Sequence, residues 1–238
     1  MRLLKWKSDG DLSLTKDLIH DIPPYAILSH TWGADTEEVT FEDLTDGTGK
    51  SKGGFNKIRF CGEQARRDNL QYIWVDTCCI DKSSSAELSE AINSMFDWYK
   101  NSTVCLAYLE DLPGDLDFEQ GLARCRWLSR GWTLQELIAP QHMEFYDQTW
   151  TKRTTKLDST TLLAKATGVN EEVLADSAHL AHPTRCAADV LGFATANYSS
   201  RGYRILHARN IRNTHAPDIR RGRQSLYASA GGDRKADL

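Results

Sequence analysis

The chain of 238 residues has no apolar run approaching the roughly 18 to 20 residues that a membrane-spanning helix needs. The pattern of a secretory signal peptide is also missing, because the charged start is not followed by a long apolar stretch. The phosphate-binding motifs G-x-G-x-x-G and G-x-x-x-x-G-K-[ST] do not occur either. These absences predict a cytoplasmic protein with no membrane partner and without a glycine-rich phosphate loop.

Cysteines are few, and their spacing does not suit a metal site, because no C-x-x-C pair exists. Two of them are adjacent and cannot form an ordinary disulfide with each other. The six cysteines are Cys61, Cys78, Cys79, Cys105, Cys125 and Cys186. We therefore expect no metal, and we predict buried structural thiols in a reducing compartment.

Charge is distributed unevenly, although the net charge is only -4. Residues 1–184 carry 19 basic and 29 acidic side chains, whereas residues 185–238 carry 10 basic and 4 acidic ones. A basic segment indicates nucleic-acid binding only if its charges form a stripe with aromatic stacking platforms. Residues 199–238 contain no Trp or Phe and show no periodicity, so we predict a disordered tail there.

Four short, nearly continuous apolar runs predict strands that are covered on both faces. They read YAILS, YIWVD, TVCLAYL and HMEFYD. Helical patterns lie between them, and the clearest is SSAELSEAINSMFDWYKN, where apolar residues recur at i, i+3, i+4 and i+7. This alternation predicts an α/β fold in which a parallel sheet is flanked by helices, a three-layer arrangement.

The boundaries of three helices can be predicted from local signals. Ser84 with Glu87 three residues later forms a capping pattern at the start of the clearest helix. Weaker helices are expected over residues 55–67 and 132–137. Residues 34–54 are rich in Gly, Asp, Thr and Lys, and we interpret them as a long surface loop.

Ligands of an open parallel sheet bind at the carboxyl ends of its strands, where the crossover connections diverge. Polar and aromatic side chains follow the first two predicted strands at this position. The candidate binding residues are Ser29, His30, Thr31, Trp32, Gly33 and Asp76. We expect them to line a crevice together with Glu136 and Trp132 from the third helix.

Glu136 lies four residues after Trp132, so the two side chains share a helix face. A carboxylate beside an aromatic wall would be partly desolvated and could orient a ribose or stabilise positive charge on a sugar ring. The alternative is a surface glutamate next to a core tryptophan. His30 could act as a base or complete a hydrogen-bond network, and Asp76 could bind a hydroxyl or cap its turn.

Three motifs together, YAILSHTWG, YIWVDTCCIDKSSSAELSEAINSMFDWYKNSTVCLAYLEDL and LSRGWTLQELIAP, closely resemble the HET domain of fungal heterokaryon-incompatibility proteins. The resemblance covers roughly residues 20–150. It implies a role in non-self recognition after hyphal fusion, where such proteins trigger programmed cell death. An upstream recognition partner is implied, but the sequence does not identify it.

HET domains are in turn similar to TIR domains, and this similarity implies a TIR-like or flavodoxin-like three-layer fold. In NAD-cleaving TIR domains a glutamate assists breakage of the nicotinamide–ribose bond, and the matching position is Glu136. NAD is then expected as a substrate rather than as a permanently bound cofactor. The alternative is a non-enzymatic death-signalling module that works by self-association or partner recruitment.

Together with the sequence pattern, the resemblance leads us to expect a HET domain at residues 1–150, a helical extension at residues 151–198 and a disordered basic tail at residues 199–238. Related proteins usually continue with a Met-Ser-Trp-Ala stretch and a Gly-Ile-Phe stretch, and neither follows His182. We therefore expect the tail to derive from a shifted reading frame or a truncated end. On this reading its charge does not indicate nucleic-acid binding.

Overall fold

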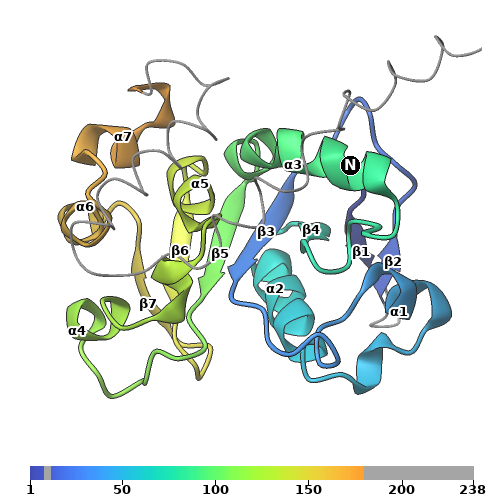
Figure 1. The fold of residues 1–238 in the computed structure, drawn as a ribbon, viewed down its shortest axis with the longest axis horizontal. Helices are drawn as coiled ribbons and strands as arrows, with labels where there is room; N and C mark the ends of the chain where they lie inside the picture. The colour runs from blue at the N-terminus through green and yellow to red at the C-terminus, as the bar shows by residue number, and fades with distance from the viewer. Residues whose placement is uncertain (8–11, 180–238) are drawn as a thin grey trace, which may run out of the picture. The chain divides into compact units, whose positions relative to one another are not determined.

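A mixed sheet of seven strands forms the centre of the protein in the computed structural model, which describes residues 1–7 and 12–179 (Figure 1). Its strand order is β2-β1-β4-β3-β5-β6-β7. The strands are β1 (Leu4–Trp6), β2 (Leu12–Leu14), β3 (Tyr25–His30), β4 (Tyr72–Trp74), β5 (Val104–Tyr108), β6 (Met143–Tyr146) and β7 (Lys152–Thr155). All of these strands belong to one compact unit of the chain.

The four central strands, β4-β3-β5-β6, are parallel, as predicted. In chain order they are the second, first, third and fourth parallel strands, which is the flavodoxin-like order. Every residue of β3 and β5 is buried, as expected for strands covered on both faces. The prediction of a parallel sheet holds for this centre, and the α/β class is confirmed.

The outer strands β1, β2 and β7 are antiparallel to their neighbours, so the whole sheet is mixed rather than parallel. They were not predicted, because each has only three or four residues. A segment of that length is too short to show a period of two. β7 consists of Lys152–Thr155 and contains no apolar residue.

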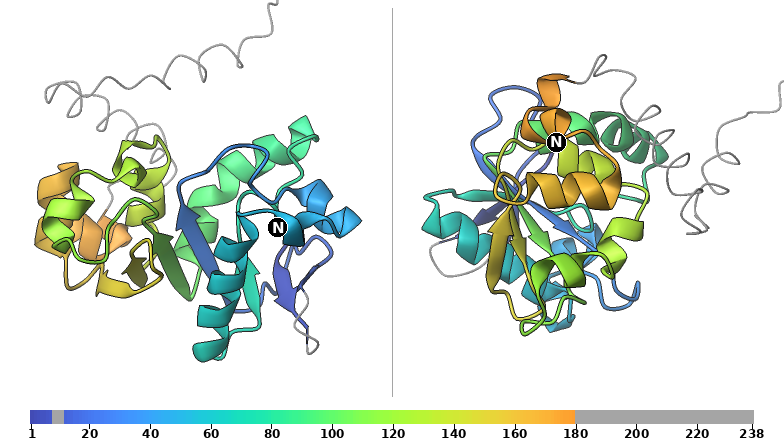
Figure 2. Two further views of the ribbon diagram at one scale, coloured as in Figure 1. Left: turned by 90° about the horizontal axis from the view of Figure 1, so that it is seen from below. Right: turned by 90° about the vertical axis from the view of Figure 1, so that its left-hand side faces the viewer.

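Seven α-helices and three short 3₁₀ helices accompany the sheet in the described residues. The α-helices are α1 (Phe41–Asp46), α2 (Phe55–Arg67), α3 (Ser85–Lys100), α4 (Phe118–Leu122), α5 (Thr133–Ile138), α6 (Thr160–Thr167) and α7 (Glu171–Ala175). The 3₁₀ helices are η1 (Gly49–Ser51), η2 (Arg126–Ser129) and η3 (Ser177–His179). α2 covers one face of the sheet, while α3 and α5 lie on the other (Figure 2).

This placement follows from the strand order. The chain leaves β3 toward β4 on one side and returns past β3 to β5 on the other. Right-handed crossovers in opposite directions put their helices on opposite faces of the sheet. The carboxyl ends of β3 and β5 are therefore the point where the connections diverge.

The predicted starts of α2 and α3 agree with the structure. The Ser84 hydroxyl accepts a hydrogen bond from the Glu87 backbone N–H at 3.3 Å, and α3 begins at Ser85. α2 has the predicted bounds. α5 spans Thr133–Ile138, one residue later than predicted.

The prediction of a surface loop over residues 34–54 was wrong, because this stretch holds α1 and η1. Thr40 caps α1 through a reciprocal pair of hydrogen bonds with Asp43. Val39 is fully buried and packs against Gly49, where an added Cβ would lie only 2.8 Å from Val39 Cγ1. The polar composition of residues 34–54 gave no indication of these few packing and capping contacts.

The sheet continues beyond residue 150, since β7 pairs with β6, and α6 and α7 follow it. The predicted disordered tail, residues 199–238, lies outside the described residues. Buried thiols are confirmed for the five cysteines that the structure describes.

Candidate functional site

The end of β3 and the start of α5 meet in a chain of buried hydrogen bonds. The Ser29 hydroxyl donates to Glu136 Oε2 at 2.5 Å. Trp127 Nε1–H in turn donates to the Ser29 hydroxyl at 2.8 Å. Glu136 is therefore fixed to the carboxyl end of β3, although 107 residues separate it from Ser29.

Arg130 binds the same carboxylate through both guanidinium nitrogens. Nη1 donates to Glu136 Oε2 at 2.9 Å, and Nη2 donates to Oε1 at 2.8 Å. Burial alone would lower the pKa of Arg130, but the charge and hydrogen bonds of Glu136 outweigh it, and the pKa is raised. The Glu136 side chain is only 2% exposed, so a buried and neutralised ion pair occupies this edge.

Such a pair is poor evidence of stabilisation. Removing two charges from water costs several kcal/mol per ion, and well-packed apolar residues often serve stability equally well or better. A buried ion pair at the strand ends, where ligands of this fold class bind, therefore points to a functional role for Glu136 and Arg130.

A second group of contacts surrounds Asp76, which follows β4. His30 Nε2 lies 3.0 Å from Asp76 Oδ1, and Trp32 Nε1–H donates to Oδ2 at 2.9 Å. Burial would raise the pKa of Asp76, but the hydrogen bond and charge of His30 lead the effects that lower it to about 2. Asp76 is therefore ionised and orients both His30 and the Trp32 indole.

Two cations connect the surroundings of Asp76 with those of Glu136. Lys82 and Arg130 both contribute to the lowered pKa of Asp76. Lys82 Nζ lies 3.8 Å from the centre of the Trp32 ring, and this indole is 43% exposed. Ser29 and His30 are consecutive on β3 and so leave it on opposite faces, but Arg130 brings the two groups of contacts together electrostatically.

The segment after β3 is held by a buried lysine from α2. Lys57 Nζ donates to the backbone carbonyl of Thr31 at 2.9 Å and to Glu38 Oε1 at 2.6 Å. Glu38 Oε1 also accepts the Gly33 backbone N–H at 2.7 Å. These bonds fix the backbone on both sides of Trp32 and so set the position of its exposed ring.

The sequence prediction was incomplete around Glu136. The backbone N–H of Glu136 donates to the Trp132 carbonyl at 3.2 Å, but the indole hydrogen-bonded to this centre belongs to Trp127. Trp127 is fully buried and was not among the predicted site residues. Arg130 was missed altogether, although its place six residues before Glu136 in the same motif offered a signal.

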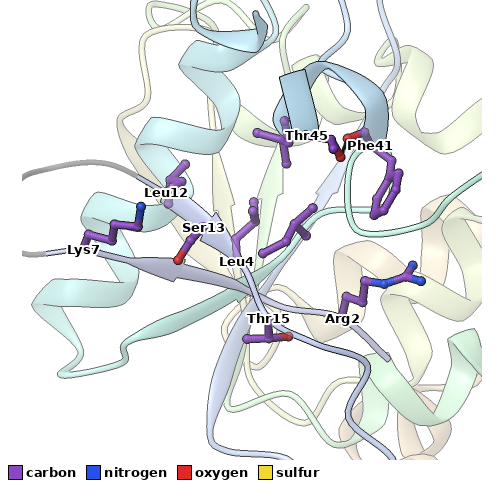
Figure 3. Close-up of a pocket in the computed structure, with 10 residues that line it drawn as sticks. Arg2, Leu4, Lys7, Leu12, Ser13, Thr15, Phe41 and Thr45 are labelled. Carbon is purple, nitrogen blue, oxygen red and sulfur yellow. Dashed lines mark hydrogen bonds between the residues drawn. The ribbon is translucent and has the colours of Figure 1, made fainter. Parts of the chain in front are cut away.

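Two buried polar atoms at the end of β3, His30 Nδ1 and Thr31 Oγ1, have no hydrogen-bond partner within the described part of the chain. A cavity of about 400 Å³ lies elsewhere, between the β1–β2 hairpin and α1 (Figure 3). None of the predicted site residues lines it. Its lining residues are Arg2, Leu4, Lys7, Leu12, Ser13, Leu14, Thr15, Phe41, Leu44 and Thr45.

Across residues 1–7 and 12–179, no group of three or more His, Cys, Asp or Glu side chains is arranged to hold a metal ion. No helix in this same part of the protein is long and apolar enough to cross a membrane.

Residues 25–120 match the family model described as heterokaryon incompatibility protein (HET). This stretch of the chain resembles a HET domain. The chain is 54% identical, over 156 residues, to the vegetative incompatibility protein HET-E-1 of Podospora anserina. This similarity covers 62% of the chain and 12% of the relative, so the chain corresponds to a small part of that protein. No solved structure matches the chain.

Only part of the candidate site lies within the residues that match the family model. The residues from the ends of β3 and β4 lie within the matched HET residues, whereas Trp127, Arg130 and Glu136 lie beyond residue 120. The buried ion pair between Arg130 and Glu136 therefore lies outside the residues that match the family model.

Proposed function

We propose that this HET domain is an effector of heterokaryon incompatibility that kills the cell after fusion with a genetically different partner. The family match and the relative named as a vegetative incompatibility protein support this role. An upstream recognition partner supplies the trigger.

The killing reaction that we propose is cleavage of the nicotinamide–ribose bond of NAD, with Glu136 as the catalytic residue. The observation that carries this proposal is a buried carboxylate at the point where the connections of a flavodoxin-like sheet diverge. The resemblance to TIR domains points to the same residue.

Glu136 would act through its charge. Departure of neutral nicotinamide leaves a positive charge resembling an oxocarbenium ion on the ribose, and water then attacks the anomeric carbon and releases a proton. A carboxylate in a site with little water stabilises that charge far more strongly than it would in bulk solvent. Ser29 and Trp127 keep the carboxylate in place during the reaction.

A non-enzymatic module is the second candidate, and a specific observation favours it. Both oxygens of Glu136 already accept hydrogen bonds from protein groups, and the side chain is 2% exposed. In that case the ion pair shapes a surface, and death follows from self-association or recruitment of a partner.

Glu136→Gln separates the two candidates. Purified protein, concentrated enough to self-associate, is incubated with NAD and assayed for free nicotinamide, and the variant is tested for killing of hyphae. Losing a positioned charge-stabilising group typically costs about 100- to 1000-fold in rate. We expect loss of that size in cleavage and loss of cell death.

Folding must be monitored, because removal of one partner from a buried ion pair costs about 3–5 kcal/mol. Thermal unfolding of the variant provides this control. Glu119→Gln is the matched substitution, since Glu119 is also ion-paired, with Lys165, but lies on the exposed side of α4. A folded Glu136→Gln variant that kills at wild-type strength would support the non-enzymatic module.

A further inference from the structure

Arg130 is the most exposed member of the hydrogen-bonded group around Glu136. Its side chain is 18% exposed, whereas Ser29 and Trp127 are completely buried. The residues on either side of Arg130 are exposed as well. A ligand approaching the Glu136 carboxylate from solvent therefore meets the Arg130 guanidinium first.

The guanidinium group binds carboxylates and phosphates with the same two-pronged geometry. Arg130 uses this geometry fully on Glu136, with distances of 2.8 and 2.9 Å. A phosphate group that reaches Arg130 competes with Glu136 for the same donors. Binding of the phosphate and release of the carboxylate are thus one exchange of partners.

The surroundings of Arg130 fit a nucleotide better than a simple anion. Lys82 supplies a second, exposed cation, and Trp32 supplies an exposed ring on which a base can stack. The Trp32 indole is held in one orientation by Asp76, and Arg130 acts electrostatically on the same Asp76. The Asp76 carboxylate is therefore acted on by both cations and holds the aromatic ring, which links Lys82 and Trp32 to Arg130.

We infer that Arg130 is the phosphate-binding residue of this site and that a nucleotide diphosphate draws it away from Glu136, which uncovers the carboxylate. The significance of the uncovered carboxylate rests on the proposed function. The binding step itself is independent of cleavage and can be measured without it.

Binding of ADP, followed by isothermal titration calorimetry, tests this exchange, and adenosine serves as the ligand without phosphates. Arg130→Gln should weaken ADP binding by about tenfold or more. Glu136→Gln should strengthen it by a similar factor, because the competing carboxylate is gone. Arg126→Gln is the matched control: Arg126 is 61% exposed, pairs with Glu110, and should leave binding unchanged.

The gain of affinity in Glu136→Gln is the decisive result, since a purely structural role for Arg130 predicts no gain. Equal affinities of wild type and Glu136→Gln would overturn the inference, as would equal binding of ADP and adenosine. If Glu136→Gln does not fold, Arg130→Lys replaces it. Arg130→Lys keeps the positive charge but loses the two-pronged guanidinium geometry, so unchanged ADP affinity would again overturn the inference.

Failure of the proposed function gives a different pattern. If wild-type protein leaves NAD intact while the variants alter ADP binding as described, cleavage is refuted and the exchange of partners stands. If nicotinamide is released but Arg130→Gln binds ADP normally, the enzyme is supported and the inference about Arg130 is refuted.

Discussion

Two buried carboxylates at the same sheet edge are satisfied by different kinds of partner. Glu136 faces a guanidinium group that stays charged at any accessible pH. Asp76 faces an imidazole and an indole N–H, together with the more distant charges of Lys82 and Arg130. The environment of Asp76 therefore stabilises its ionised form through several weaker contributions.

Asp76 should make the free energy of unfolding depend on pH in acid. Its pKa falls from 3.8 to about 2 on folding, so its stabilising contribution is complete above pH 4 and is lost as the pH falls through 2. The shift corresponds to about 2 kcal/mol. We expect the difference in unfolding free energy between wild type and Asp76→Asn to shrink by that amount, as measured by urea titrations from pH 5 to 2.

Carboxylates shared by both proteins cancel in this difference. A difference that stays constant between pH 4 and 2 would show that Asp76 is not selectively stabilised in its ionised form.

The residues of the site could be predicted from the sequence where they follow directly from strand ends. Ser29 and His30 end β3 and Asp76 follows β4, and the apolar runs of these strands mark where the sheet edge lies. Arg130 and Trp127 belong to η2 and the connection after it, which have no apolar period. The distance of Arg130 and Trp127 from Glu136 depends on how that connection folds over the sheet. The local sequence pattern does not determine this distance.

At the scale of elements, α5 is a short helix whose six residues are all buried. Lys156, which follows β7, binds the carboxyl end of α5. Lys156 Nζ donates to the carbonyls of Leu137 and Ile138 at 3.3 and 3.4 Å, and also to that of Pro140. The helix that carries Glu136 is therefore fastened from the opposite end by a buried cation.

Burial lowers the pKa of Lys156 from 10.5 to about 8. Between these values the unfolded chain binds a proton that the folded protein does not, so this residue makes stability rise with pH. We expect the unfolding free energy of wild type minus that of Lys156→Met to increase by about 3 kcal/mol from pH 8 to 10.5. Denaturant titrations at several pH values measure it.

Tyrosines and cysteines also titrate in this range, but they are common to both proteins. A pH-independent difference would mean that Lys156 keeps its ordinary affinity for protons in the folded state.

The elements differ in how well the sequence predicted them. α3 has 16 residues and a strong apolar stripe, so both its existence and its start could be predicted. α1 and the outer strands are three to six residues long and owe their conformation to neighbours. Their residues show too few repeats for a period to be recognised.

At the scale of the whole molecule, buried thiols are distributed over several layers of the fold. Cys105 lies in β5, Cys61 lies in α2, and Cys78 and Cys79 follow β4. Burial raises the pKa of the Cys61, Cys78 and Cys105 thiols, and it raises the pKa of Cys125, which follows α4, to about 12. Little reactive thiolate is therefore present in the folded protein.

A thiol reagent should consequently report opening of the fold as a whole. In a Cys186→Ser variant, we expect no rapid reaction with Ellman's reagent under native conditions and five reactive thiols in denaturant. The absorbance of the released thiolate measures both. A thiol that reacts rapidly in the native variant would show that one layer opens separately from the rest.

The position of β3 in the middle of the sheet has a consequence for synthesis on the ribosome. β3 is made early, but its partners β4 and β5 follow at residues 72–74 and 104–108, and β5 gains its second neighbour only with β6. A nascent chain ending at residue 120 therefore exposes an unpaired, apolar strand edge. It also lacks Glu136. If the proposed function holds, an unfinished polypeptide is harmless to the cell that makes it. The catalytic Glu136 and the strand β6 that covers the free edge of β5 are synthesised within a few residues of each other.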